Sequence, residues 1–286
     1  MKDKTILEDF KKIYPEKFPS PEAIFSRIHA GDRIFIGTGC GEPQYLVHEL
    51  VDYVNKNPKA FFDAELIHIW TLGVAPYTDE KFQDNFRLDS FFVGDSTRGS
   101  VNRGAADYTP VFLSSVPDLF RSEMVPVDIA LVQTSLPDKH GYLSLGISVD
   151  VVKSALKKSE IVVAQVNENM PRTHGDGFVH INDIDFILPH DEPLLEYSVK
   201  APNDIVQKIG KYVARIIEDG STIQVGYGLI PDEVMHSLEE KEDLGVHTEL
   251  LSDGIIELMK KGVITNQRKI HNPGKTIASF CMGSRD

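Results

Sequence analysis

Short apolar runs rich in β-branched residues alternate with amphipathic helical patterns along most of this chain. The clearest runs are Arg33–Gly37 (RIFIG), Asp128–Gln133 (DIALVQ) and Ile161–Val166 (IVVAQV), which are largely apolar on both faces. Strands that are buried on both faces are typical of parallel sheets covered by helices. The alternation therefore predicts an α/β fold with a mostly parallel sheet.

Further elements are predicted around these runs. Additional strands are expected at Leu66–Thr71 and Phe91–Val93, and helices are expected at Gln44–Asn55 and Val149–Ser159. The second of these helices is rich in lysine toward its end, which interacts favourably with the carbonyl end of the helix dipole. Together these elements predict one strand-and-helix domain in the first part of the chain.

A second series of elements follows. Two prolines in His190–Asn203 predict a connection, so the first domain is expected to span residues 1–190 and the second residues 191–286. The helices and strands predicted there are Asp204–Glu218, Thr222–Val225, Pro231–Glu240, Leu244–His247, Gly254–Lys261 and Thr276–Phe280. Since the sequence stops soon after a predicted strand, with no helix to cover it, the second domain is expected to be incomplete.

The composition argues against several classes of protein. The net charge of −13 at pH 7 is unsuited to a general nucleic-acid or anionic-membrane binder. No apolar stretch is long enough for a membrane span, and the charged N-terminus has no signal-peptide core. Cys40 and Cys281 are too few for a disulfide framework and match no metal-site spacing, so a cytoplasmic protein is expected.

Two segments of the second domain could carry chemistry. The first, Gly226–Ile230 (GYGLI), lies between a predicted strand and a predicted helix, where glycine lets a ligand approach the backbone and helix N–H groups favour an anion. The second places Glu249 just after a predicted strand, at the edge where open α/β sheets bind ligands. From the residues alone, ordinary turn glycines and a solvated loop glutamate are the commoner explanation.

Seven longer segments occur together in the chain, and they favour a functional interpretation of the glycine loop and the glutamate. They are GTGCGEPQ (Gly37–Gln44), FFVGDSTRGSVNRG (Phe91–Gly104), YTPVFLSSVPDLF (Tyr108–Phe120), DIALVQTSLPDKHGYLSLG (Asp128–Gly146), VVAQVNENMPRTHGDGFVHINDIDFIL (Val162–Leu188), GYGLIPDEV (Gly226–Val234) and GVHTELLSDG (Gly245–Gly254). In this order and spacing they resemble the acetyl-CoA hydrolase/transferase family, in particular its 4-hydroxybutyrate and butyryl-CoA:acetate CoA-transferases. The resemblance covers nearly the whole chain and implies two open α/β domains of the CoA-transferase type.

The resemblance implies an acyl-CoA:carboxylate CoA-transferase with acetate as one partner and a butyrate or 4-hydroxybutyrate type of acyl group. It implies that Glu249 is the nucleophile and forms a glutamyl-CoA thioester in a ping-pong mechanism. The implied CoA-binding loop consists of Gly226, Tyr227, Gly228, Leu229 and Ile230. Coenzyme A enters as a substrate, so no tightly bound cofactor and no metal are expected, and the enzyme is expected to be a cytoplasmic homodimer.

Other segments of the family motifs are less specific. Asp95–Arg98, Asn167–Met170 and Arg172–Asp176 are expected to face the acyl and carboxylate pocket. The loop Gly37–Gln44 is expected either to line the cleft between the domains or to serve backbone conformation alone.

Three alternatives to a CoA-transferase stay open at this point. An acyl-CoA hydrolase would use the same glutamate but would release CoA without an acceptor carboxylate. A CoA-binding module without turnover would fit an incomplete second domain. A sugar-phosphate isomerase on a related α/β fold would explain the glycine loops but not the HTE segment that contains Glu249.

Overall fold

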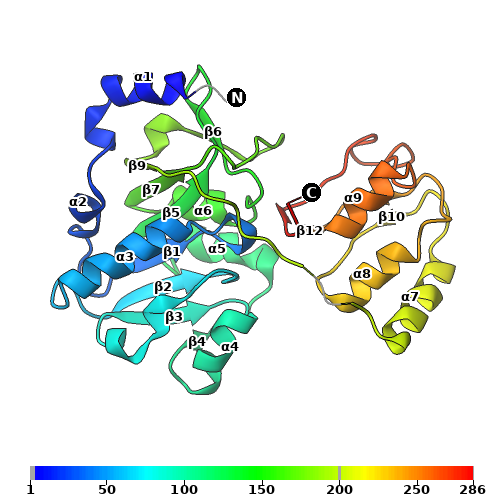
Figure 1. The fold of residues 1–286 in the computed structure, drawn as a ribbon, viewed down its shortest axis with the longest axis horizontal. Helices are drawn as coiled ribbons and strands as arrows, with labels where there is room; N and C mark the ends of the chain where they lie inside the picture. The colour runs from blue at the N-terminus through cyan, green and yellow to red at the C-terminus, as the bar shows by residue number, and fades with distance from the viewer. Residues whose placement is uncertain (1–3, 199–200, 286) are drawn as a thin grey trace. The chain divides into compact units, whose positions relative to one another are not determined.

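The computed structural model describes residues 4–198 and 201–285, and the chain forms two compact units that divide between Leu195 and Glu196 (Figure 1). Each unit has its own strands and its own apolar core. The connection predicted at 190–203 has no regular structure over residues 190–198, and its residues 199 and 200 lie outside the described ones.

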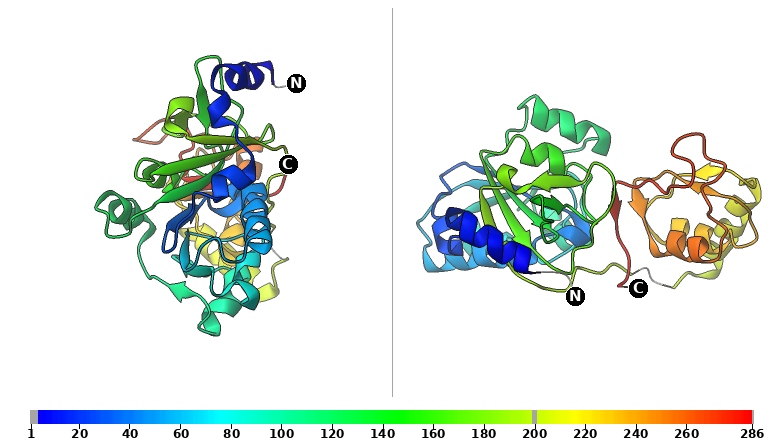
Figure 2. Two further views of the ribbon diagram at one scale, coloured as in Figure 1. Left: turned by 90° about the vertical axis from the view of Figure 1, so that its left-hand side faces the viewer. Right: turned by 90° about the horizontal axis from the view of Figure 1, so that it is seen from above.

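Helices cover both faces of the central sheet in the first unit (Figure 2). Ile34 and Ile36 belong to the core shared with α2 and α3, while Phe35 belongs to the core shared with α5 and α6. Successive residues of the first strand are therefore buried on opposite faces, which explains its unbroken apolar sequence. The α-helices of the described residues in this unit are α1 (Thr5–Ile13), α2 (Pro21–Phe25), α3 (Gln44–Lys56), α4 (Asp95–Asn102), α5 (Val116–Arg121) and α6 (Val152–Leu156).

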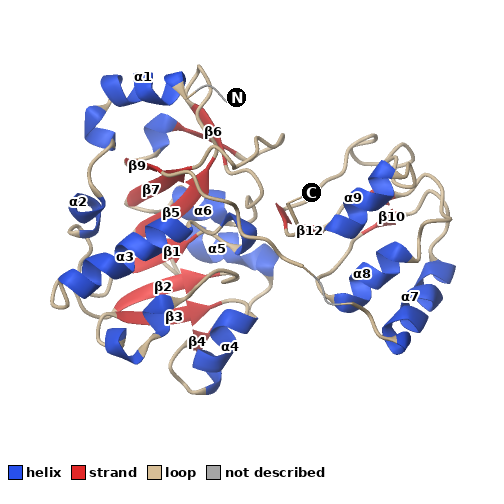
Figure 3. Ribbon diagram, in the orientation of Figure 1, coloured by secondary structure: helices blue, strands red, loops and turns tan. Residues whose placement is uncertain are grey.

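The sheet has seven parallel strands in the order β4-β3-β2-β1-β5-β7-β9 (Figure 3). The strands are β1 (Arg33–Ile36), β2 (Ala64–His68), β3 (Phe86–Ser90), β4 (Asp107–Tyr108), β5 (Ile129–Thr134), β7 (Ile161–Val166) and β9 (Phe186–Pro189). The chain runs from β1 outward to β4 and then returns to β5 on the other side of β1. The predicted α/β fold with a mostly parallel sheet is confirmed.

Several features of the first unit differ from the sequence predictions: the strand predicted at Leu66–Thr71 is Ala64–His68, and the helix predicted at Val149–Ser159 is Val152–Leu156. The strand predicted at Phe91–Val93 is wrong, because β3 ends just before this segment. In β3 Phe86 and Leu88 are buried while Arg87 is exposed, so its period-2 alternation escapes a search for continuous apolar runs. A short antiparallel pair, β6 (Tyr142–Ser144) with β8 (Phe178–His180), was not predicted, since three-residue strands carry little periodicity.

The second unit combines short parallel strand pairs with helices. Its described elements are α7 (Asp204–Ile216), β10 (Thr222–Ile223), α8 (Leu229–His236), β11 (Gly245–Val246), β12 (Leu250–Leu251), α9 (Asp253–Lys260) and β13 (Phe280–Cys281). β10 pairs with β11 and β12 pairs with β13, and a bridge from His247 to Ile277 extends the same parallel arrangement. In the part of the chain that the structure describes, no helix is both long and apolar enough to cross a membrane.

Candidate functional site

The two segments that the sequence points to follow neighbouring parallel strands of the second unit. Gly226–Ile230 comes after β10 and Glu249 comes after β11, and these strands pair with Ile223 opposite Val246. Because parallel strands end at the same edge of a sheet, the glycine loop and the glutamate lie at one edge, where α/β sheets bind ligands.

Glu249 lies in the bend between β11 and β12 and is exposed. Its carbonyl oxygen accepts hydrogen bonds from the backbone N–H groups of Ser279, at 2.9 Å, and Phe280, at 3.2 Å. One residue earlier, the N–H of Thr248 donates to the carbonyl of Ile277 at 2.9 Å. The main chain that carries the glutamate is thus held in place, while the residue remains accessible to a substrate.

The glycine loop ends in a conformation that favours glycine. Gly228 has φ 119° and ψ 179° and caps the N-terminus of α8, which begins at Leu229. The helix start predicted at Pro231 is therefore wrong by two residues, because proline is tolerated throughout the first helical turn, where N–H groups have no intrahelical partner. Tyr227 and Ile230 are 42% and 43% exposed, so the loop presents apolar surface to solvent.

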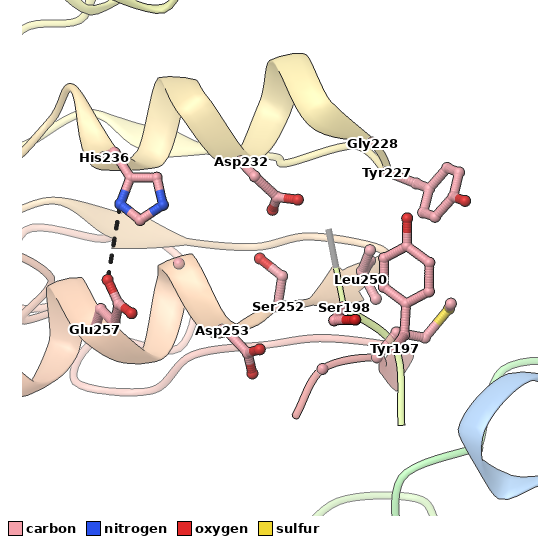
Figure 4. Close-up of a pocket in the computed structure, with 13 residues that line it drawn as sticks. Tyr197, Ser198, Tyr227, Gly228, Asp232, His236, Leu250, Ser252, Asp253 and Glu257 are labelled. Atoms are coloured by element: carbon pink, nitrogen blue, oxygen red, sulfur yellow. Dashed lines mark ion pairs between the residues drawn. The ribbon is translucent and has the colours of Figure 1, made fainter. Parts of the chain in front are cut away.

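A pocket open to solvent, with an empty volume of about 730 Å³, lies beside this loop (Figure 4). It includes Tyr227 and Gly228 of the predicted loop and Leu250 next to the glutamate, whereas Glu249 does not line it. The lining residues are Tyr197, Ser198, Tyr227, Gly228, Asp232, His236, Leu250, Ser252, Asp253, Gly254, Glu257, Met282 and Gly283. Both α8 and α9 begin at its wall, so the N-termini of two helices contribute to one pocket.

Three carboxylates, those of Asp232, Asp253 and Glu257, line this pocket. Burial raises the pKa of Asp232, the nearby Asp253 raises it further, and His236 opposes the shift. The imidazole Nδ1 of His236 lies 3.8 Å from a carboxylate oxygen of Glu257. Ser252 is buried, and its hydroxyl has no hydrogen-bond partner among the described residues. Among residues 4–198 and 201–285 no Lys or Arg lines this pocket, and its carboxylates would repel a polyphosphate.

The sheet of the first unit also carries a buried polar cluster at its carboxyl edge. Glu42 follows β1 and is fully buried, and its carboxylate accepts hydrogen bonds from Leu72 N, at 3.2 Å, and Gly73 N, at 3.0 Å. Burial raises the pKa of Glu42 to about 7. Gln133 at the end of β5 donates to the Glu42 carbonyl at 3.1 Å. The cluster lies where the chain departs from β1 to one side and from β5 to the other, the usual ligand position in such sheets.

Two of the weaker candidate segments have local partners. Asp95 opens α4, and its fully exposed carboxylate lies 3.8 Å from Arg98. Arg172 donates to the Tyr142 carbonyl at 2.8 Å and pairs with Asp138 at 3.1 Å. The guanidinium therefore stabilises the surroundings of the β6–β8 pair, and a role in substrate binding stays a prediction.

Burial affects both cysteines of the chain. Cys40 is buried, and burial raises the pKa of Cys281 to about 11, so this thiol is protonated at neutral pH. Over residues 4–198 and 201–285, no three His, Cys, Asp or Glu side chains gather as a metal site would require.

Comparison with known proteins identifies the family. Residues 2–196 match the sequence profile of the Acetyl-CoA hydrolase/transferase N-terminal domain. The chain belongs to the acetyl-CoA hydrolase/transferase family. It is 44% identical over 277 residues to the 4-hydroxybutyrate coenzyme A transferase of Clostridium kluyveri, across 97% of this chain and 64% of that protein.

Two further similar proteins support this assignment. The chain is 40% identical to the succinyl-CoA:acetate/propanoyl-CoA:succinate CoA transferase of Fasciola hepatica, across 95% of this chain and 57% of the relative. The crystal structure of RipA from Yersinia pestis superposes with a TM-score of 0.88 at 29% identity, across 96% of this chain and 66% of that chain. The chain therefore spans less than two thirds of the length of these curated relatives.

The predicted membership of the acetyl-CoA hydrolase/transferase family is confirmed. The predicted roles of Glu249 and of the loop Gly226–Ile230 lie outside the matched residues 2–196 and stay predictions, as do the homodimer and the cytoplasmic location. Sequence reasoning did not single out Thr248 or the buried state of Glu42.

Proposed function

We propose that this chain is the glutamate-bearing part of an acyl-CoA:carboxylate CoA-transferase, with acetate as one partner and an acyl group of the 4-hydroxybutyrate or butyrate type. The observation that carries the proposal is the placement of Glu249, exposed on a firmly bonded main chain at the end of a parallel strand and next to a glycine loop. The names of the two curated relatives, both CoA transferases, support the same reaction class.

The proposed chemistry begins at the Glu249 carboxylate. One of its oxygens attacks the thioester carbonyl carbon of acyl-CoA, the carbon–sulfur bond breaks, and an acyl-glutamyl anhydride and CoA thiolate form. The thiolate then attacks the glutamyl carbonyl and expels the acyl group as a free carboxylate, which leaves a glutamyl-CoA thioester. A second carboxylate reverses these steps and departs as the new acyl-CoA. One thioester is consumed and one is formed, so no further energy source is needed.

The glycine loop is proposed to stabilise this chemistry. The backbone N–H groups that open α8 have no intrahelical partners, and they form the positive end of the helix dipole beside the loop. Donors placed there would stabilise an oxyanion or the thiolate. Asp232 and Asp253 line the adjacent pocket, and their carboxylates would repel phosphate groups. We therefore propose that the uncharged pantetheine end of CoA lies in this pocket and that the phosphates bind elsewhere.

A covalent adduct tests the proposal. The full-length protein that carries this sequence is incubated with acyl-CoA, and intact mass and peptide mapping should find CoA on Glu249, removable by hydroxylamine. Glu249→Gln should abolish the adduct, while Glu240→Gln, an exposed glutamate near the opposite edge of the sheet, should retain it. An adduct on another residue would contradict the assignment.

Two further measurements separate the alternatives. CoA release without an added carboxylate would instead identify a hydrolase. Calorimetry should detect binding of CoA but not of a pentose phosphate, and the reverse result would favour an isomerase.

A further inference from the structure

The backbone ladder between β10 and β11 ends just before the candidate site. Its last bond runs from His247 N to Ile223 O, at 3.1 Å. In a continuing parallel pair the next bond of this kind, two residues further on both strands, would join Glu249 N to Val225 O. At this position the Val225 carbonyl instead accepts a hydrogen bond from the Thr248 hydroxyl at 2.9 Å.

The Thr248 hydroxyl makes a second bond to the same residue. Val225 N donates to its Oγ1, also at 2.9 Å, so one hydroxyl binds both backbone groups of Val225. Both residues are buried, and therefore water does not compete for these bonds. A side chain thus continues the connection between the two strands where their backbones separate.

We propose that Thr248 is a positioning residue that fixes the distance between the glycine loop and Glu249. This inference rests on the proposed function, because it concerns the same glutamate. Val225 directly precedes Gly226, and Thr248 directly precedes Glu249, so the bridge lies one residue from each partner. A displacement of about 1 Å at a reacting group can cost about 10²-fold in rate.

Three variants of the full-length protein test the proposal. Thr248→Val keeps the shape but removes both hydrogen bonds, whereas Thr248→Ser keeps the hydroxyl. Thr265→Val is the matched control, since the Thr265 hydroxyl donates to Asp243 at 2.9 Å near the start of β11, away from the site. The rate of glutamyl-CoA thioester formation is measured at saturating acyl-CoA, together with KM.

We expect Thr248→Val to slow thioester formation by about 10- to 100-fold with KM changed by less than about threefold. Thr248→Ser should recover a rate close to that of the wild type, and Thr265→Val should leave the rate unchanged. An unchanged rate in Thr248→Val, or an equal loss in the serine or control variant, overturns the proposal. If Thr248→Val does not fold, Thr248→Cys, which carries only a weak donor, is compared with Thr248→Ser by the same criteria.

Glu249→Gln separates the two proposals. An adduct that survives in this variant overturns the proposed function and the positioning role with it. Loss of the adduct in Glu249→Gln, together with a wild-type rate in Thr248→Val, overturns the positioning role alone.

Discussion

The side-chain amide of Asn167 donates a hydrogen bond of 2.6 Å to the side-chain carbonyl of Gln133, and it thereby ties the end of β7 to the end of β5. Both residues are buried. Gln133 in turn donates to the Glu42 carbonyl beyond β1. Side chains therefore join three neighbouring strands at the edge where their backbone ladder ends, and they hold the loops there in a defined arrangement.

Removing the amide of Asn167 should destabilise the first unit. In Asn167→Leu the buried Gln133 carbonyl oxygen loses this partner, which should lower the free energy of unfolding by about 1–3 kcal/mol. Urea denaturation measures the loss, and the double variant with Gln133→Leu should lose less stability than the sum of the two single variants. Asn55→Ala, at an exposed position, should change stability by less than about 0.5 kcal/mol. Equal losses at both asparagines would contradict a special role for the buried pair.

Two buried groups give the stability of the first unit opposing dependences on pH. Burial raises the pKa of Glu42 from 4.5 to about 7, so its contribution to stability is full below pH 4.5 and is lost as pH rises towards 7. Burial lowers the pKa of His68 from 6.5 to about 3, so its contribution is full above pH 6.5 and is lost as pH falls towards 3. Between pH 4.5 and 6.5 the two slopes partly cancel in the wild-type protein.

Single variants should reveal these slopes. Glu42→Gln removes the loss of stability with rising pH that the carboxyl group causes. The free energy of unfolding of this variant, relative to that of the wild type, should therefore rise between pH 4.5 and 7 by an amount of the order of 3 kcal/mol. His68→Gln should instead remove the gain of stability with rising pH that the buried imidazole causes. Urea denaturation at a series of pH values measures both, and curves that run parallel to the wild type would show that these groups do not titrate as described.

Glycine-to-alanine substitutions in the glycine loop should distinguish a loss of CoA contact from a loss of stability caused by backbone strain. Among the described residues a Cβ on Gly226 would meet only Pro231, at 3.8 Å, so Gly226→Ala should fold normally while CoA affinity, measured by calorimetry, falls by at least about tenfold. Gly228→Ala should also lower stability, by about 1–3 kcal/mol, because its φ of 119° disfavours any side chain. Gly262→Ala, with φ 77° and open space, serves as a strain control whose CoA affinity should not change. Wild-type CoA affinity in Gly226→Ala would show that the loop is ordinary turn structure.

The elements that the sequence predicted well are those that are buried on both faces along their whole length. β7 has the predicted bounds, Ile161–Val166, because a strand covered on both faces is apolar at nearly every position, and Gln165 is its one polar residue. β3 was missed because it lies near the edge of the sheet, where Arg87 is exposed between two buried residues. The first turn of α8 was missed because Pro231 is compatible with more than one starting position.

By itself, the sequence determined the α/β class, the family and the two segments that meet at the edge of the second sheet, because these depend on local pattern and on long motifs in a fixed order. Only the tertiary structure decided which polar groups are buried and what they bind. The link from Thr248 to Val225 spans 23 residues and depends on the register of β10 and β11. The pKa of Glu42 depends on the layers that exclude water around it. Register and burial arise from contacts between distant segments, which no local pattern of residues contains.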